Sequence, residues 1–451
     1  MSGAAAEATR DPADREASRA RWARAAVLAA VLVGAALRVW IGIAQPMSDL
    51  RGDSVTFAYT ATHGWSALSA YYPLLPQLYY MAVAALTGLS GGTLLLVDPH
   101  AGRVLAVAGV LPAVATIVLV ERLARRLGGV RAGVVAAWLA AVSPSLIFAS
   151  SRIMTESIVV AATAATLLAW YRLVDDPTWR NAAWAVAAVT ALVFTRAEGL
   201  AIVLIMAMHL AWLALRSPDR TSPERTGGPV AGRGAGAALA LVVLVVPSVV
   251  FAGWSVWSTR LDQGGVDEVG MTSFGLTALA GNCPSAYRQG PLIGWKSYPC
   301  IGLGDPKDPE VQRWAASRRP RPLLKEYVRE AGPARVLGVS MIKVLRANGL
   351  FAPKLTVRLQ AQDAAWPVGI FRWTLRWWWF LLATAAGGLV LVRRAGSSLV
   401  PLLAPVLTAN AAIFLTWGNP RYRAMAEPSL LVAASCLIAA TTAALSRRGA
   451  Q

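Results

Sequence analysis

Long apolar segments recur along the whole chain and limit the folds open to it. About 20 consecutive apolar residues allow a helix to cross a membrane. With 56% hydrophobic and only 15% charged residues, the chain suits lipid rather than water as its solvent. We therefore predict an all-α polytopic protein of the cell membrane. The apolar segments lie near residues 24–45, 102–121, 132–150, 157–172, 182–215, 237–258, 377–392, 398–417 and 428–445.

The segment 182–215 is too long for a single crossing. As one helix it would extend about 50 Å, and Arg196 and Glu198 interrupt it near its middle. We split it at residues 195–199, where Gly199 suits a sharp bend. The sequence then predicts about ten membrane-spanning helices.

Arginines at the ends of the apolar segments set the predicted orientation. Positively charged short loops stay in the cytoplasm, which places both termini there and residues 259–376 outside. The segment 71–92 would invert this order if it crossed, so we read it as juxtamembrane or re-entrant helices broken at Pro73 and Pro76. The net charge of +19 therefore reflects the arginines that set the orientation in the membrane, and it does not indicate nucleic-acid binding.

These expectations divide the chain into four parts. In the long outer segment, residues 322–349 fit either an amphipathic helix lying on the membrane or an ordinary surface helix. The expected parts are a disordered cytoplasmic tail (1–23), an N-terminal transmembrane module (24–258, with a first outer loop at 46–101), an extracytoplasmic subdomain (259–376) and a C-terminal transmembrane module (377–451).

One of the three cysteines lies in a predicted membrane span, and the other two lie in the predicted outer segment. Cys436 lies inside the last apolar segment and is expected to be a small buried side chain. Cys283 and Cys300 fall in the outer segment, an oxidising environment, so we predict a disulfide between them. No metal-ligand spacing is visible, although a divalent cation is possible at the site.

Charged side chains gather at the predicted outer ends of the spans. Ionisable groups at this depth are costly in lipid and usually functional. They predict a shared polar cavity, with separate local salt bridges at each corner as the alternative. The residues are Asp49, Arg51 and Asp53 after the first span, Arg103, Arg152 with Glu156, Arg196 with Glu198, and Arg421, Arg423 and Glu427. Tyr422, between the last two arginines, is a further candidate for substrate binding.

Arginines and carboxylates together suggest a chemistry for such a cavity. Guanidinium groups bind phosphate through paired hydrogen bonds, and a carboxylate can take the proton of an attacking hydroxyl. This combination indicates transfer of a group from a polyprenyl phosphate to an acceptor. No nucleotide-binding motif is present, which argues against a nucleotide-sugar donor.

The ordered motifs resemble the integral-membrane GT-C glycosyltransferases, in particular the family of protein O-mannosyltransferases and the lipid A aminoarabinose transferase. The resemblance covers nearly the whole chain. It rests on Asp53 with Tyr59, Tyr-Tyr-Pro-Leu-Leu-Pro at 71–76, Arg103, Arg-Arg-Leu-Gly at 125–128, Ser-Pro at 143–144 leading to Arg152-Ile-Met-Thr-Glu156, Thr-Arg-Ala-Glu-Gly at 195–199, and Arg421-Tyr-Arg423.

The resemblance implies an inverting transferase that uses a polyprenyl-phosphate sugar, with Asp53 as general base and with Arg196 and Arg421 or Arg423 near the phosphate. The acceptor would be a glycan, a protein or a lipid at the outer membrane face. The O-mannosyltransferases carry Asp-Glu in the first outer loop, whereas Ser54 follows Asp53 here. Glu156 is therefore a candidate for the second carboxylate.

Two other functions compete with a transferase. A transporter or flippase for a lipid-linked sugar would also use outer arginines, but it should show repeated halves and broken helices at the midplane. If the protein is instead a structural or assembly subunit without catalytic activity, the outer carboxylates should be dispensable for its function.

Overall fold

The computed structural model describes residues 12–44, 53–68, 72–89, 99–216, 233–258, 273–288, 290–317 and 319–448, and these residues form helices and connecting turns without a strand. Seven segments in this part of the chain are long and apolar enough to cross a membrane. The long apolar helices are α2 (Pro12–Ala44), α6 (Val110–Val142), α8 (Glu156–Asp175), α9 (Trp179–Thr195), α10 (Gly199–Arg216), α11 (Arg233–Ser258), α18 (Val368–Arg394), α19 (Val400–Leu415) and α20 (Glu427–Arg448).

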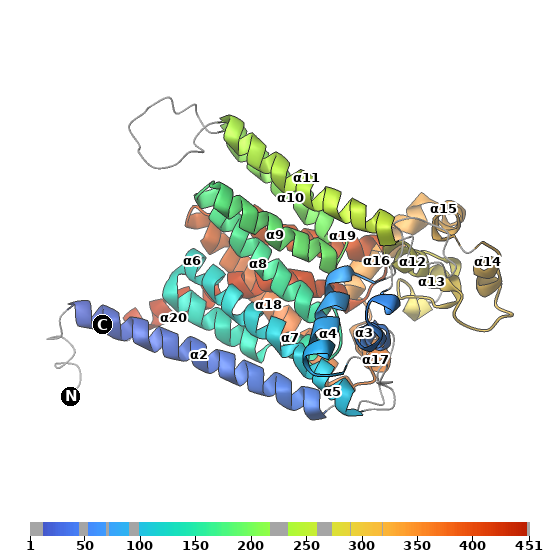
Figure 1. The fold of residues 1–451 in the computed structure, drawn as a ribbon, viewed down its shortest axis with the longest axis horizontal. Helices are drawn as coiled ribbons and strands as arrows, with labels where there is room; N and C mark the ends of the chain where they lie inside the picture. Colours follow the sequence, from blue (N-terminus) through green and yellow to red (C-terminus); the bar gives the residue numbers. More distant parts are fainter. Residues whose placement is uncertain are drawn as a thin grey trace.

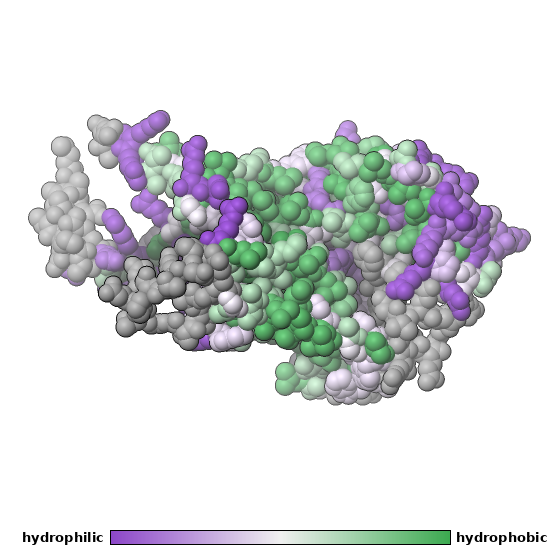
Figure 2. Space-filling view, turned by 90° about the horizontal axis from the view of Figure 1, so that it is seen from above, coloured by the Kyte–Doolittle hydropathy of each residue, from purple (hydrophilic) through white to green (hydrophobic). Residues whose placement is uncertain are grey.

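The arrangement is that of a polytopic membrane protein. Figure 1 shows the long helices side by side, with the start of α2 and the end of α20 at one end of the bundle. Figure 2 shows hydrophobic residues over the middle of one face and hydrophilic residues towards both ends. The predicted fold class, an all-α membrane protein, is therefore confirmed.

α6 is a helical hairpin and accounts for two of the predicted spans. Gly129 has a φ of 79° inside it, where the chain reverses. A Cβ added at Gly133 in the second arm would meet Glu121 in the first, so the two arms run antiparallel. With the arms counted separately, and with the shorter α9 and α19, the described helices match the ten expected segments.

Shorter helices cover the end of the bundle away from the start of α2 (Figure 1). Before the hairpin these are α3 (Asp53–His63), α4 (Leu74–Leu86) and α5 (Pro99–Ala108), and α7 (Pro144–Ser150) follows it. The remaining helices are α12 (Ser273–Gly281), α13 (Pro284–Arg288), α14 (Pro309–Ser317), α15 (Pro320–Ala331), α16 (Pro333–Ala347), α17 (Pro353–Ala364) and the 3-10 turn η5 (Pro420–Ala426).

Three local predictions were wrong. The first helix begins at Pro12, so residues 12–23 are helical and not disordered. α4 is one helix of 13 residues because Pro73 precedes it and Pro76 lies in its first turn, where proline is tolerated. The segment 322–349 is not one helix, because Gly332, with a φ of 77°, and the proline after it separate α15 from α16.

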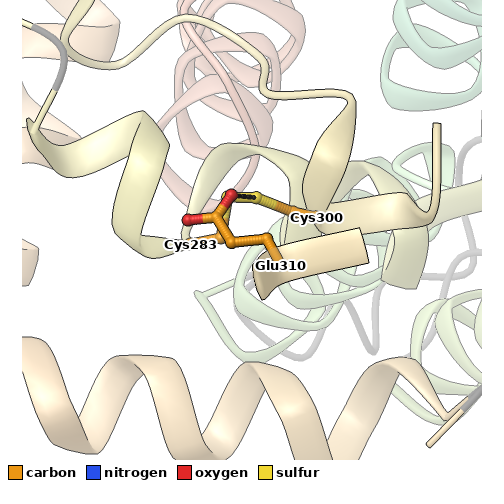
Figure 3. Close-up of side chains that lie close together, drawn as sticks. All are labelled: Cys283, Cys300 and Glu310. Carbon is orange, nitrogen blue, oxygen red and sulfur yellow. Dashed lines mark hydrogen bonds between the residues drawn. A yellow bond between two sulfur atoms is a disulfide. The ribbon is translucent and has the colours of Figure 1, made fainter. Parts of the chain in front are cut away.

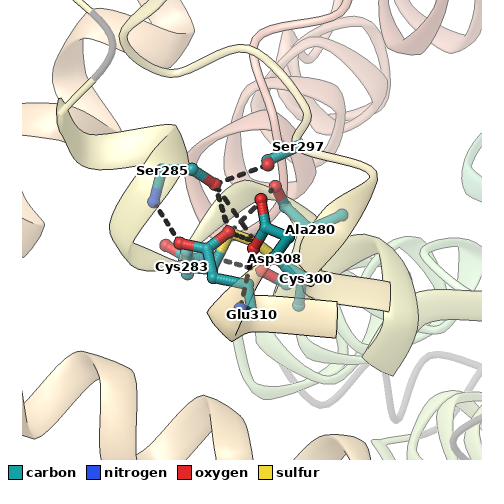
Figure 4. The surroundings of a disulfide bond; sticks show 9 residues. Ala280, Cys283, Ser285, Ser297, Cys300, Asp308 and Glu310 are labelled. Carbon is teal, nitrogen blue, oxygen red and sulfur yellow. Dashed lines mark hydrogen bonds between the residues drawn. A yellow bond between two sulfur atoms is a disulfide. The ribbon is translucent and has the colours of Figure 1, made fainter. Parts of the chain in front are cut away.

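The disulfide between Cys283 and Cys300 lies in a small core of its own. Both cysteines are fully buried, next to Leu279, Leu323 and Tyr327. Figure 4 shows the serine and carboxylate side chains around this disulfide. The outer segment thus has an apolar core separate from that of the bundle, and this core fixes the backbone between the two cysteines.

Candidate functional site

A cavity of about 530 Å³ lies at the end of the bundle that the short helices cover. Stretches far apart in the sequence supply its walls, among them the start of α3, the α7–α8 junction, the α9–α10 junction, the disulfide-closed segment, α17 and residues 417–422. Charged and aromatic side chains line it. The predicted shared cavity is therefore present in the structure, and the corner charges are not all separate local pairs.

Arg421 lies at the centre of this charge cluster. Its Nη2 donates to Asp53 Oδ2 at 2.8 Å, and its Nε donates to Glu156 Oε1 at 2.7 Å. One guanidinium thereby joins two carboxylates that are far from it, and from each other, in the sequence. The two acids differ in access, because the Asp53 side chain is 35% exposed and that of Glu156 only 5%.

Local structure explains how these three side chains are held. Asp53 is the first residue of α3 and Glu156 the first of α8, so each carboxylate lies at the positive end of a helix dipole. Asn419 caps η5 by accepting a hydrogen bond from the Arg421 amide at 3.0 Å. The backbone at all three positions is thus fixed before any ligand enters.

The charges around Asp53 favour its ionised form. Burial alone would raise the pKa of its carboxyl, but Arg421 and then Lys296 and Arg196 outweigh burial and lower the pKa below its ordinary value. Asp53 is therefore a carboxylate at neutral pH, able to accept a proton or to bind a cation.

Arg196 and Arg152 line the same cavity. Arg196 directly follows α9, pairs with Glu198 at 3.7 Å and lies 4.3 Å above the ring of Tyr422. Its buried Nη1 has no hydrogen-bond partner within the described part of the protein. Arg152 is buried and lies over the ring of Phe148. An anion entering here would meet several guanidinium groups, one of them with a free donor.

Two of the predicted binding arginines lie elsewhere. Arg103 is exposed on α5 and does not line the cavity, because the opposite face of that short helix packs against the core. Arg423 lies over Trp378 at 4.5 Å and lines a smaller adjoining pocket together with Glu427, Arg421 and Glu156. The three arginines expected to share one phosphate are thus divided between two pockets, with Arg196 in the cavity, Arg423 in the smaller pocket and Arg421 in both.

The geometry of η5 explains the separation of Arg421 from Arg423. A 3-10 helix has about three residues per turn, so side chains two residues apart point in different directions. Glu427 accepts hydrogen bonds from Ser143 Oγ at 2.7 Å and Ser145 Oγ at 2.5 Å, which holds it in the smaller pocket. Of the other charges expected at this face, Asp49 and Arg51 lie outside the described residues.

The lining residues that the sequence analysis did not identify include Lys296, Asp363, Tyr298 and Trp417. Lys296 pairs with Asp363 at 2.7 Å and lies 4.7 Å from the ring of Tyr298 and 5.4 Å from that of Trp417. Trp417 was visible in the sequence two residues before the Asn-Pro-Arg-Tyr-Arg motif, with Gly418 between them. Lys296, Asp363 and Tyr298 could not be identified from the sequence. Their positions in the cavity depend on how the outer segment folds back over the bundle.

One group of potential metal ligands occurs in the described part of the chain, at Cys283, Cys300 and Glu310. Figure 3 shows the Glu310 carboxylate beside the disulfide. Because the two cysteines are bonded to each other, neither offers a thiolate to a cation. Glu310 instead accepts hydrogen bonds from the Ser285 amide and hydroxyl and ties α14 to α13.

Residues 89–252 match the model of a protein family described as dolichyl-phosphate-mannose-protein mannosyltransferase. This stretch includes Arg152, Glu156, Arg196 and Glu198, whereas Asp53 and Arg421 lie outside it. The resemblance to membrane glycosyltransferases drawn from the motifs is confirmed over this part of the chain. No curated protein matches the chain.

Among solved structures, the chain is similar to the archaeal oligosaccharyltransferase AglB from Archaeoglobus fulgidus in complex with an inhibitory peptide and a dolichol-phosphate. The identity is 16%, the TM-score 0.48, and the match covers 93% of this chain and 50% of that one. The apo form of the Archaeoglobus fulgidus oligosaccharyltransferase gives 16% identity and a TM-score of 0.48, over 92% of this chain and 50% of that one. The chain thus spans about half the length of these enzymes.

Proposed function

Because residues 89–252 match a mannosyltransferase family model, we propose that the chain is a membrane glycosyltransferase. It moves a sugar from a polyprenyl-phosphate donor to the hydroxyl of an acceptor, with inversion at the anomeric carbon. The active-site cavity faces the extracytoplasmic side. The observation that carries the proposal is Arg421, which joins Asp53 in the wall of the cavity to Glu156 in the wall of the smaller adjoining pocket, at one end of an apolar bundle.

In this mechanism the bond between the anomeric carbon and the donor phosphate oxygen breaks, and the phosphate keeps the electron pair. The acceptor oxygen bonds to the opposite face of that carbon, and its proton passes to a carboxylate. Asp53 suits this role better than Glu156 because its side chain is more accessible from the cavity. Arg196 and Arg421 stabilise the charge that develops on the leaving phosphate.

Arg421 links phosphate binding to the base. In the free protein it stabilises the Asp53 carboxylate and so weakens its basicity. A donor phosphate that shares the guanidinium draws part of this interaction away. Asp53 then becomes a stronger base when the donor is in place, which couples proton transfer to donor binding.

The class of reaction is tested by incubating the purified protein with a panel of radiolabelled polyprenyl-phosphate sugars and membrane extract. Label that moves to any acceptor supports a transferase and identifies the donor. Donor that crosses a vesicle membrane without transfer would support a flippase and contradict the proposal.

The base is tested with Asp53→Asn, which keeps the size of the side chain and removes its basicity. We expect transfer to fall by about 10²-fold or more, with donor binding near normal. Glu156→Gln is the comparison within the site, and Asp305→Asn, on an exposed residue of the outer segment, is the matched control. If Asp53→Asn stays active while Glu156→Gln does not, Glu156 is the base.

A further inference from the structure

Lys296 is the one lysine among the residues that line the cavity, and it is almost enclosed. Its side chain is 11% exposed, and its ammonium faces the rings of Tyr298 and Trp417. Its charge acts on Asp53, as do the charges of Arg196 and Arg421. These three cations therefore surround the same carboxylate, although Lys296 comes from a different part of the chain.

The backbone on both sides of Lys296 is fixed by the fold. The disulfide closes the segment that contains it, and the Ser297 amide donates to the Ala280 carbonyl at 2.9 Å. The Gly294 carbonyl accepts from the Gly418 amide at 2.8 Å, next to Trp417. The lysine is thus preorganised in the cavity wall, which lowers the entropic cost of using it to bind a ligand.

The partner of Lys296 is a carboxylate that also faces the cavity. Asp363, on α17, lies 2.7 Å from the Lys296 ammonium and is itself 29% exposed. A carboxylate and a phosphate oxygen present the same charge and the same acceptor chemistry to an ammonium group. Asp363 therefore occupies the position on Lys296 that a ligand phosphate would take.

We propose that Lys296 is a further phosphate-binding residue of the donor site and that Asp363 is a positioning residue which competes with the phosphate for it. This inference rests on the proposed function. When the glycosidic bond breaks, the donor phosphodiester becomes a phosphate monoester and gains a second negative charge. Lys296 exchanges Asp363 for this phosphate, so its interaction strengthens as the bond breaks, as transition-state stabilisation requires.

Competition inside the site gives opposite effects for the two partners. Lys296→Met removes the cation and should weaken the binding of a short-chain polyprenyl phosphate by about tenfold or more. Asp363→Asn removes the competing charge and should tighten that binding several-fold. Lys307→Met, on an exposed lysine of the same outer segment, is the matched control and should leave binding unchanged.

The measurement is the dissociation constant of polyprenyl phosphate in detergent, with the thermal midpoint recorded for every variant. Lys296→Arg keeps the charge and should restore part of the affinity, so the test survives if Lys296→Met folds poorly. Inorganic phosphate is the second probe. If it binds as tightly as the lipid phosphate and responds equally to both substitutions, the site takes free phosphate and the proposal for the lipid donor is wrong.

Two further results would overturn the proposal. Equal loss of affinity in Lys296→Met and Asp363→Asn would mean that the ion pair is structural, and unchanged affinity in both would mean that neither faces the ligand. Arg421→Lys separates these outcomes from failure of the proposed function. If Arg421→Lys weakens binding while Lys296→Met does not, the donor site stands and only the role of Lys296 is lost.

Discussion

At the scale of single residues, the geometry of one guanidinium decides how the site is built. The Nε and Nη2 of Arg421 reach two different carboxylates, which a single ammonium on a flexible stem cannot reproduce. Arg421→Lys should therefore weaken donor binding by about tenfold or more while the protein still folds. The measurement is donor affinity beside the thermal midpoint, with Arg103→Lys as the exposed control. If Arg421→Lys binds the donor with normal affinity, the ion pairs of Arg421 are structural and do not bind the donor.

A buried lysine in the outer segment makes stability depend on pH. Lys343 is fully buried in α16 and donates to Asn282 Oδ1 at 2.7 Å, and burial lowers the pKa of its ammonium to about 7. Between this value and about 10.4 the unfolded chain holds the proton and the folded chain does not. The free energy of unfolding should therefore rise with pH over this range and level off below about pH 7.

The test compares thermal midpoints in detergent between pH 6.5 and 9, a range chosen to begin about half a unit below that pKa. Lys343→Met should flatten the rise, because the group that titrates is gone. Lys325→Met removes an exposed lysine from the neighbouring helix α15 and should leave the slope as it is. Equal slopes in the native protein and in Lys343→Met would show that Lys343 stays charged when folded.

At the scale of helices, close approach without side chains holds α18 against α20. A Cβ added at Gly388 would lie 1.7 Å from the Ala433 carbonyl oxygen, so no larger residue fits without a backbone shift. Small residues at such contacts let membrane helices pack closely. Gly388→Ala should lower the free energy of unfolding by about 1–3 kcal/mol, the usual cost of overpacking.

Gly369→Ala is the matched control for this contact. The same substitution is made in the same helix, but a Cβ there meets nothing within 4 Å. It should be neutral or should stabilise the protein by up to about 1 kcal/mol, because alanine restricts the unfolded chain. Thermal midpoints of the two variants in detergent decide the point, and equal midpoints would mean that α18 and α20 can separate without cost.

At the scale of the whole molecule, the proposed orientation makes the two ends of the bundle accessible from opposite sides of the membrane. Lys307 lies in the outer segment and Ala395 in the turn between α18 and α19, and both are exposed. A membrane-impermeant maleimide should label Lys307→Cys in intact cells and Ala395→Cys only after permeabilisation. If only Ala395→Cys is labelled in intact cells, the orientation in the membrane is opposite to the proposed one.

Short-range properties of the sequence determined the membrane architecture. Apolar length is local along the chain, and a helix in lipid satisfies its backbone hydrogen bonds within itself, so the spans follow from composition. The break at Arg196 and the placement of Asp53, Glu156 and Arg421 at one end of the bundle followed in the same way. A disulfide between Cys283 and Cys300 was expected from their position in the long outer segment, and one joins them in the structure.

Only the tertiary structure decided which charges meet. Arg421 contacts Asp53 and Glu156 from 368 and 265 residues away, and spacing within one segment carries no record of such pairs. Arg103 and Arg423 looked equivalent to Arg421 in the sequence, yet neither lines the cavity: Arg103 is exposed on α5, and Arg423 lines only the smaller pocket. Lys296 enters the cavity because the outer segment folds back over the bundle. Side-chain contacts of this range depend on packing between elements, whereas apolar length depends on each element alone.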